Sequence, residues 1–237
     1  MLKKKFPTMI LQTVKKNFQE ILRNIQDLKI KPSQPVTVIG VTKYHTIQHV
    51  KAAQIAGIKN LGESKVQEAE KKYNIIKKEK KTRLHLIGHL QSNKTKKAVS
   101  FFDVIQTIDS IRLAEKINKE AKKINKKQQV FLQINISNDP KKYGFSEREA
   151  ILGCLDIQKL SNIQVLGLMT ITANSLKEYE LRKCYEKMRR LRRKVKSEGL
   201  SLCKNLSMGM SRDYLCAIEE GATHVRIGTQ LFGERPR

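Results

Sequence analysis

One lysine lies where chemistry with a carbonyl group requires an amine. Lys43 ends the apolar run 36–43, which has the pattern of a strand, and a helical pattern begins near residue 46. An amine at such a strand end is partly removed from water, which lowers the pKa of a lysine. Because only the neutral amine attacks an aldehyde, Lys43 is a candidate for forming a Schiff base. A surface lysine is the plain alternative, since Lys is abundant in this chain.

A second group of residues, near the end of the chain, is suited to binding an anion. Ser211 has the position of an N-cap that opens a helix over 213–220, and Gly228-Thr229 follows the last predicted strand. Both places offer hydroxyl and backbone N–H groups, as anion sites at helix N-termini do, and ordinary caps and turns are the alternative. An aldehyde cofactor that carries a phosphate and is held by a lysine is pyridoxal 5'-phosphate.

These residues are spaced along a chain in which strands and helices alternate. The strand-like segments are short and rich in Val and Ile, whereas the segments between them have helical periodicity. Strands are predicted at 36–43, 60–64, 83–88, 104–109, 130–136, 165–171, 205–210 and 224–228. Helices are predicted at 9–29, 46–56, 64–79, 91–99, 111–126, 145–158, 176–198 and 211–220.

Repeated strand-to-helix connection makes the strands parallel, in either a closed barrel or an open doubly wound sheet. Eight strands favour an α/β fold of the (β/α)8 barrel type, and no glycine-rich dinucleotide turn follows the first strand. Residues 1–237 are therefore predicted to form one barrel domain, with 1–35 as a helical extension. Active sites of such barrels lie at the C-terminal strand ends, with phosphate often held after strands seven and eight. Pairing of strand eight with strand one would place Arg226 beside Lys43.

A set of short motifs makes the chain resemble the pyridoxal 5'-phosphate homeostasis protein family. The resemblance extends from about residue 36 onward, in the order and spacing of that family. The motifs are VTK at 41–43, GESKVQE at 62–68, LHLIGHLQSNK at 84–94, GLM at 167–169, LSMGMS at 206–211 and VRIGT at 225–229. The resemblance implies a single-domain barrel like the N-terminal domain of alanine racemase, with the cofactor attached to a lysine as an internal aldimine.

The resemblance also implies a role for each matching residue. Lys43 would carry the cofactor as a Schiff base, and Arg226 would face the pyridine nitrogen. Ser211, Gly228 and Thr229 would hold the phosphate. Two positions depart from the family pattern: Ser64 stands where the family usually has Asn, and Leu84 where it usually has Trp. We expect the first departure to affect cofactor binding and the second to concern packing.

Composition limits the remaining possibilities. The chain has 237 residues, 39 % of them hydrophobic, and no apolar run near the ~20 residues of a membrane helix, so a soluble protein is expected. Four scattered cysteines and an N-terminus without a cleavage signal favour the cytoplasm. The net charge of +26 comes mostly from lysines in helical segments without aromatic residues between them. Solvated helix faces explain this better than a functional polyanion site, so only nonspecific binding of nucleic acid is expected.

Two functions follow from the predicted site. The first is a carrier that sequesters pyridoxal 5'-phosphate, supports vitamin B6 and amino-acid homeostasis, and supplies PLP-dependent apoenzymes. A guanidinium keeps its proton, so Arg226 would leave the ring nitrogen unprotonated and the ring a poor electron sink. The alternative is a PLP-dependent amino-acid racemase, but only eight residues follow Thr229, too few for the second domain of racemases of this type. Strong catalysis is therefore not expected, although weak racemase-like activity is compatible with the site.

Weaker signals complete the sequence-based expectations. The histidine pairs 45/49 and 85/89 have a spacing found in metal sites, but no glutamate accompanies them as in zinc proteases, so no metal site is predicted. The loop 139–144 resembles a family loop at Lys142 and Gly144, and a plain turn explains it equally well. A monomer is expected.

Overall fold

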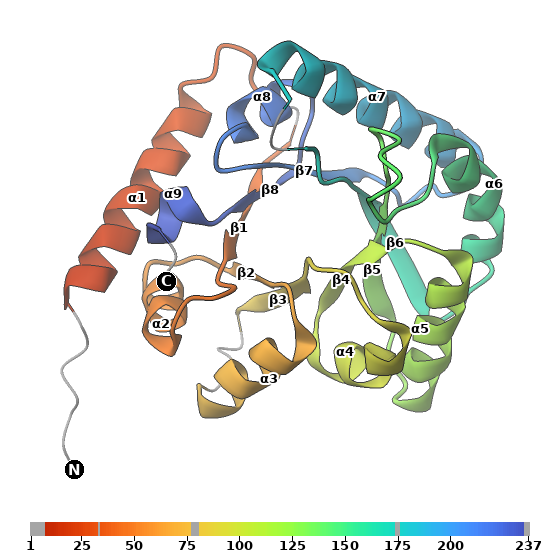
Figure 1. The fold of residues 1–237 in the computed structure, drawn as a ribbon, viewed down its shortest axis with the longest axis horizontal. Coiled ribbons are helices and arrows are strands. Elements are labelled where there is room, and N and C mark those ends of the chain that lie inside the picture. The colour runs from red at the N-terminus through yellow and green to blue at the C-terminus, as the bar shows by residue number, and fades with distance from the viewer. Residues whose placement is uncertain (1–7, 33, 77–80, 174–175, 235–237) are drawn as a thin grey trace.

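The computed structural model shows a closed barrel of eight parallel strands surrounded by helices (Figure 1). It describes residues 8–32, 34–76, 81–173 and 176–234. The strands are β1 (Thr37–Val41), β2 (Asn60–Glu63), β3 (Arg83–Leu86), β4 (Val104–Ile108), β5 (Gln128–Gln133), β6 (Ile163–Met169), β7 (Asn205–Met210) and β8 (His224–Ile227). Each strand pairs with its neighbour in the sequence, so the predicted fold class is confirmed.

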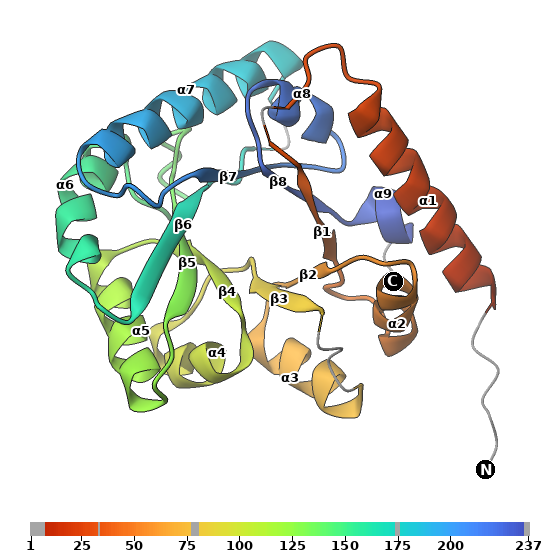
Figure 2. The same ribbon diagram turned by 180° about the vertical axis from the view of Figure 1, so that it is seen from behind.

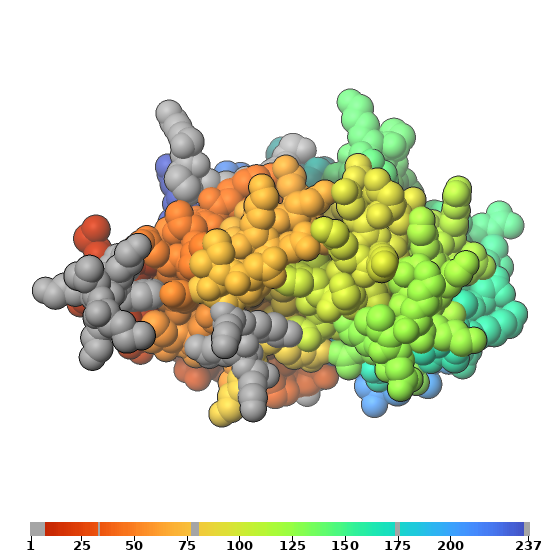
Figure 3. Space-filling model, turned by 90° about the horizontal axis from the view of Figure 1, so that it is seen from below, coloured from red at the N-terminus to blue at the C-terminus, as the bar shows by residue number. Residues whose placement is uncertain are grey.

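Helices follow the strands and cover the outside of the barrel. They are α1 (Thr8–Gln26), α2 (Ile47–Ile55), α3 (Val66–Ile75), α4 (Thr95–Phe101), α5 (Ile111–Lys123), α6 (Glu147–Gln158), α7 (Glu178–Ser197), α8 (Tyr214–Glu219) and α9 (Thr229–Phe232), with a 3-10 turn η1 at Ser92–Lys94. Figure 3 shows the segments from α2 to α5, in orange to green, forming one continuous face of the molecule. Within the described residues, no helix is long and apolar enough to cross a membrane.

Closure of the barrel depends on the parallel pairing of β1 with β8. The register runs from Thr37 opposite His224 to Gly40 opposite Ile227. Side chains alternate between the two faces of a strand, so one set faces the helices and the other faces the interior. Gly40 belongs to the outer set, because a Cβ there would meet Leu231 at 3.2 Å. Closure therefore aligns the beginning and the end of the chain at one seam.

Helix α1 lies outside the repeating strand-helix units. Figure 2 shows it beside α2 and α9, and it packs against both. Asn17 donates a hydrogen bond to the carbonyl of Leu231, and Asn24 donates one to the hydroxyl of Tyr214. The predicted N-terminal helix is present, although residues 1–7 and 33 of the predicted extension lie outside the described residues.

Several predicted strands extend too far at their C-terminal ends. The predicted first strand reached residue 43, whereas β1 ends at Val41 and the next backbone bond, from Thr42 N–H to the Gly62 carbonyl, belongs to the loop. Some of these loops continue with buried apolar residues, such as Ile87, Ile134 and Ile136, which extend the strand-like pattern beyond the paired residues. The predicted helix over 64–79 starts at Val66, and 77–79 lie outside the described residues. Helix α9 was not predicted.

Partial burial of His224, at the start of β8, makes stability depend on pH. Removal from water, aided by the charges of Arg83 and Arg226, lowers the pKa of His224 from 6.5 to about 4. Between these values the unfolded chain binds a proton that the folded protein does not, so the free energy of unfolding falls as pH falls. Between pH 7.5 and pH 5, protonation of His224 in the unfolded chain should lower the free energy of unfolding by about 2 kcal/mol. We expect the free energy of unfolding of His224→Gln, measured with urea, to lose this part of its pH dependence. If its change between pH 7.5 and pH 5 equals that of the wild type, His224 is not the responsible group.

Candidate functional site

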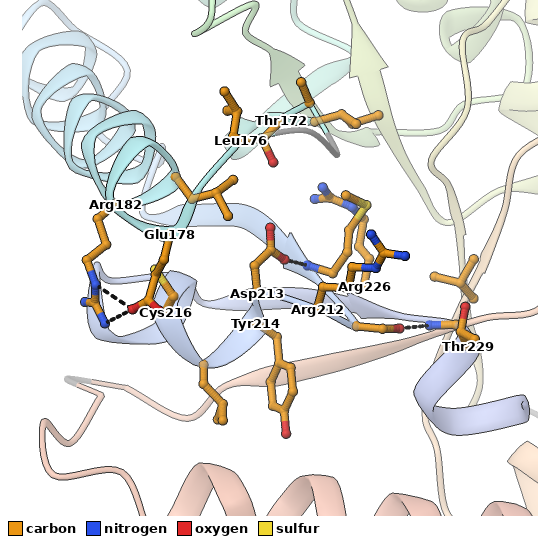
Figure 4. A pocket seen from close by; sticks show the side chains of 18 of the residues that line it. Thr172, Leu176, Glu178, Arg182, Arg212, Asp213, Tyr214, Cys216, Arg226 and Thr229 are labelled. Atoms are coloured by element: carbon orange, nitrogen blue, oxygen red, sulfur yellow. Dashed lines mark hydrogen bonds and ion pairs between the residues drawn. The ribbon is translucent and has the colours of Figure 1, made fainter.

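A cavity of about 1160 Å³ lies at the C-terminal ends of the strands. Its lining includes all five residues that the sequence singled out: Lys43 after β1, Ser211 after β7, Arg226 on β8, and Gly228 and Thr229 where β8 passes into α9. Figure 4 shows Arg226, from β8, in one wall with Asp213 and Thr229, which come from the connections after β7 and β8. The fold thus brings residues from both ends of the chain around one space.

The turn that carries Lys43 is held on one side by the buried Lys72 side chain and on the other by the partly buried Glu68 side chain. The Thr42 carbonyl accepts hydrogen bonds from the Lys72 ammonium, at 2.7 Å, and from the His45 N–H, at 3.1 Å. Tyr44 has a φ of 65°, a conformation that costs energy for residues other than glycine. Its N–H donates to Glu68 Oε1 at 2.6 Å, which stabilises that conformation. These contacts fix the backbone immediately before and after Lys43.

Two carboxylates share the Lys72 ammonium. Lys72 Nζ lies 3.1 Å from Glu63 Oε1 and 2.7 Å from Glu68 Oε1. Glu63 is fully buried, and it also accepts a hydrogen bond from the Thr42 hydroxyl at 2.7 Å. Burial raises the pKa of Glu63 despite the opposing effect of Lys72. Burial would raise the pKa of Glu68 as well, but hydrogen bonds from Lys72 and the Tyr44 N–H outweigh it, and the net effect is a lowered pKa.

Sequence reasoning assigned no role to these three residues. Glu63 and Glu68 belong to the motif GESKVQE, and Lys72 lies one helical turn after Glu68, the spacing of an ion pair on α3. That spacing was the available signal. In a chain with 48 basic residues, however, nothing in the sequence distinguishes a buried lysine from an exposed one.

Ser211 is in the cavity, but the prediction that it is a helix N-cap is wrong. Helix α8 begins at Tyr214, and Asp213 occupies the N-cap position. Gly209, with a φ of 89°, turns the chain at the end of β7, and Asp213 Oδ1 accepts a hydrogen bond from the Met210 N–H at 2.6 Å. This local bond delays the start of the helix.

Ser211 instead ties two loops together. Its Oγ accepts hydrogen bonds from the N–H groups of Gly228, at 3.2 Å, and Gln230, at 3.4 Å. A hydroxyl that accepts two hydrogen bonds still has one hydrogen to donate. Because α8 and α9 have only six and four residues, their dipoles are weak, and this wall is suited to an anion mainly through its hydroxyl and backbone N–H groups.

Arg226 projects from β8 into the barrel and is only 4 % exposed. It donates hydrogen bonds to Ser207 Oγ at 2.8 Å and to the Thr170 carbonyl at 2.7 Å. Burial lowers its pKa to about 10, although the nearby Tyr185 and Asp213 act in the opposite direction, so the guanidinium remains charged at neutral pH. The register places Arg226 opposite Ile39 rather than Lys43. The two residues therefore meet through the cavity that both line, not as neighbours on paired strands.

Other lining residues were not predicted to face the cavity. Arg212 and Lys142 add two cationic side chains. Lys142 belongs to the loop 139–144, which the sequence explains equally well as a family motif or as a plain turn. Of the two departures from the family pattern, Leu84 is fully buried in the hydrophobic core. The carbonyl of Ser64 packs so closely on Gly88 that a Cβ at Gly88 would lie 2.2 Å from it. A cluster of three or more potential metal ligands was not found in the described part of the chain.

Fold and site together define a barrel of the class found in alanine racemases. The sequence model of the alanine racemase N-terminal domain matches residues 17–236. An alanine racemase from Corynebacterium glutamicum has this fold, with a TM-score of 0.76 over 94 % of this chain and 62 % of its own, at 15 % identity. At that identity the likeness concerns the fold alone.

Closer relatives identify the family. The pyridoxal phosphate homeostasis protein of Aquifex aeolicus is 38 % identical over 199 residues, 84 % of this chain and 86 % of its own. That of Pasteurella multocida is 34 % identical over 229 residues, 94 % of this chain and 98 % of its own. PipY of Synechococcus elongatus, solved with PLP bound, has a TM-score of 0.84 at 31 % identity, over 93 % of this chain and all of its own. The chain belongs to the pyridoxal phosphate homeostasis protein family.

The shared ammonium of Lys72 yields a prediction about stability. Lys72→Met leaves the buried Glu63 carboxylate and the partly buried Glu68 carboxylate without their cation, which should lower the free energy of unfolding by about 3–5 kcal/mol. Urea unfolding at pH 7.5 measures the change. Lys71→Met, at the exposed neighbouring position on α3, is the matched control and should change little. A loss below about 1 kcal/mol, typical of surface pairs, would show that the pair is solvated.

Proposed function

We propose that this chain binds pyridoxal 5'-phosphate in the cavity and acts as a carrier that supports vitamin B6 and amino-acid homeostasis. The observation that carries the proposal is the meeting of Lys43, Arg226, Ser211, Gly228 and Thr229 around one space. The curated relatives, named for pyridoxal phosphate homeostasis, and PipY with its bound PLP support it.

The groups in the cavity fit each part of this cofactor. Its aldehyde forms a reversible carbon–nitrogen bond with an amine, with loss of one water, and Lys43 supplies the amine. Ser211 retains a hydroxyl hydrogen to donate to a phosphate oxygen, and Thr229 and the backbone near Gly228 complete that end. The charged guanidinium of Arg226 is suited to donating a hydrogen bond to the ring nitrogen.

The charge of Arg226 favours carrying over catalysis. A guanidinium that keeps its proton leaves the ring nitrogen unprotonated, so the cofactor stabilises a carbanion poorly. Transaminase and decarboxylase chemistry is disfavoured on this ground. Racemisation, the alternative function, needs a positioned acid on each side of the cofactor, and Lys43 supplies one at most.

The proposal extends to partners and location. PLP-dependent apoenzymes would receive the cofactor, and the protein would act as a monomer. Four free cysteines, of which Cys154, Cys203 and Cys216 are buried, are compatible with a reducing compartment such as the cytoplasm. Binding of nucleic acid would be limited to nonspecific attraction by the positive charge.

Replacing the lysine tests the covalent attachment. Lys43→Ala should abolish the borohydride-stable attachment of pyridoxal 5'-phosphate to the protein, measured as the mass of the intact chain after reduction. Lys65→Ala is the control, because Lys65 lies close by, with its Nζ 5.8 Å from the centre of the Tyr44 ring, and should retain full attachment. Attachment to Lys43→Ala at the wild-type level would assign the amine to another residue.

The phosphate end is tested by removing two hydroxyls. A hydrogen bond to a charged group contributes on the order of 1.5–3 kcal/mol, so Ser211→Ala combined with Thr229→Val should weaken cofactor retention at least tenfold. Equilibrium dialysis measures the loss, and the pair Thr13→Val and Ser197→Ala, both exposed on helices, serves as control. Retention equal to the wild type would place the phosphate elsewhere in the cavity.

An assay for D-amino acids separates the carrier from the racemase. The loaded wild-type protein should show no turnover of alanine approaching ordinary enzymatic rates, which are on the order of 1–10³ s⁻¹. Chiral chromatography after incubation with L-alanine is the measurement. Turnover within that range would show that the protein is a racemase and would contradict the proposed carrier function.

A further inference from the structure

A chain of hydrogen bonds crosses the interior of the barrel from β2 to Arg226. The Asn60 Oδ1 lies 3.0 Å from His85 Nε2, and the other ring nitrogen, Nδ1, lies 2.9 Å from Gln106 Nε2. Gln106 Oε1 lies 2.7 Å from Ser207 Oγ, which lies 2.8 Å from the Arg226 guanidinium. His85, Gln106 and Ser207 are each at most 1 % exposed. Polar side chains buried this deeply depend on one another for hydrogen bonds.

The guanidinium fixes the direction of every bond in this chain. Arginine has no acceptor, so Ser207 Oγ must accept from Arg226. The hydroxyl hydrogen of Ser207 is then donated to Gln106 Oε1, which turns the amide N–H of Gln106 toward His85. His85 Nδ1 must accept that hydrogen bond, so the ring proton is on Nε2 and is donated to Asn60.

The reverse direction conflicts with the arginine. A hydrogen on His85 Nδ1 would face the amide N–H of Gln106, and the amide would have to turn over. Its NH2 group would then point at Ser207 Oγ, which already accepts from Arg226. The Ser207 hydroxyl would be left facing two donors, without the acceptor for its own hydrogen.

We propose that His85, Gln106 and Ser207 are positioning residues that hold the Arg226 guanidinium in one orientation toward the cavity. The described residues provide no ion pair for Arg226, so its orientation depends on the neutral acceptors Ser207 and Thr170. These two bonds use two of the five N–H hydrogens of a guanidinium. The effect of this orientation on a bound cofactor rests on the proposed function. If the cavity binds pyridoxal 5'-phosphate, a guanidinium held in this way presents a fixed N–H donor to the ring nitrogen.

The tautomer of His85 tests the direction of the chain in protein free of cofactor. The sequence has five histidines, and the NMR signals of His85 are those that disappear in His85→Gln. Nitrogen-15 NMR of the imidazoles should show neutral His85 with its proton on Nε2. Gln106→Glu has nearly the same shape but offers only acceptors, so it should move the proton to Nδ1. A wild-type ring protonated at Nδ1, or an unchanged ring in Gln106→Glu, would overturn the inference.

The orientation of Arg226 is tested by two substitutions at one position. In Ser207→Ala the guanidinium N–H hydrogens should exchange with water at least tenfold faster than in the wild type, and Ser207→Thr, which restores a hydroxyl, should return the exchange toward the wild-type rate. Ser201→Ala, at an exposed position, is the control. Equal exchange in the wild type and Ser207→Ala would overturn the positioning role. If a Ser207 variant does not fold by urea titration, Gln106→Glu carries the test.

Binding of pyridoxal 5'-phosphate distinguishes this inference from the proposed function. In the loaded protein, Ser207→Ala should weaken binding about tenfold and shift the cofactor absorbance maximum, whereas Ser207→Thr should do neither. A wild type that binds no cofactor but shows the expected tautomer and exchange would overturn the proposed function alone. If Ser207→Ala binds the cofactor with the same affinity and the same absorbance maximum as the wild type, the hydrogen-bond chain has no role in cofactor binding.

Discussion

Pairing of β1 with β8 is the constraint on which the cavity depends. Lys43 belongs to the first strand-helix unit and Arg226, Gly228 and Thr229 to the last, so no local structure brings them together. A closed parallel barrel does so by geometry, because all strand ends of one kind lie on the same face. Beside this seam, Ser211 joins the connection after β7 to the start of α9, because its hydroxyl oxygen accepts hydrogen bonds from the N–H groups of Gly228 and Gln230. The site is therefore a property of the closed sheet rather than of any one loop.

Two buried cations near this seam are stabilised in different ways. Lys72 is compensated by Glu63 and Glu68, and together the three side chains hold the turn of Lys43. Arg226 is held by a hydroxyl and a carbonyl oxygen, which orient its guanidinium without neutralising it. The first arrangement is a structural clamp, and the second leaves positive charge exposed to whatever enters the cavity. The ion pairs of Lys72 thus fix the backbone beside Lys43, whereas the charge of Arg226 faces the cavity.

The architecture could be predicted from the sequence because the strands and helices each have a recognisable local periodicity of apolar residues. Alternation of short Val- and Ile-rich runs with helical segments identifies eight strand-helix units, and eight parallel strands close into a barrel. The five cavity residues could be singled out because strand ends in a barrel converge. Details that depend on competing local bonds could not: Asp213 captures the Met210 N–H and displaces the expected cap at Ser211. The burial of Gln106 was also missed, because its partners His85 and Ser207 are distant in sequence, and that of Lys72 because its spacing to Glu68 does not distinguish a buried pair from an exposed one.

The contact of α1 with α9 has a consequence for how the protein is made. During translation α1 emerges well before its hydrogen-bond partners, because Tyr214 lies 190 residues after Asn24 and Leu231 lies 214 residues after Asn17. A nascent chain that ends before β8 has an open seam and lacks Arg226, Gly228 and Thr229 altogether. Long-range pairings of this kind form late and slowly. Helix α1 therefore gains these contacts, and the cavity gains its Arg226 wall, only after β8 has been synthesised.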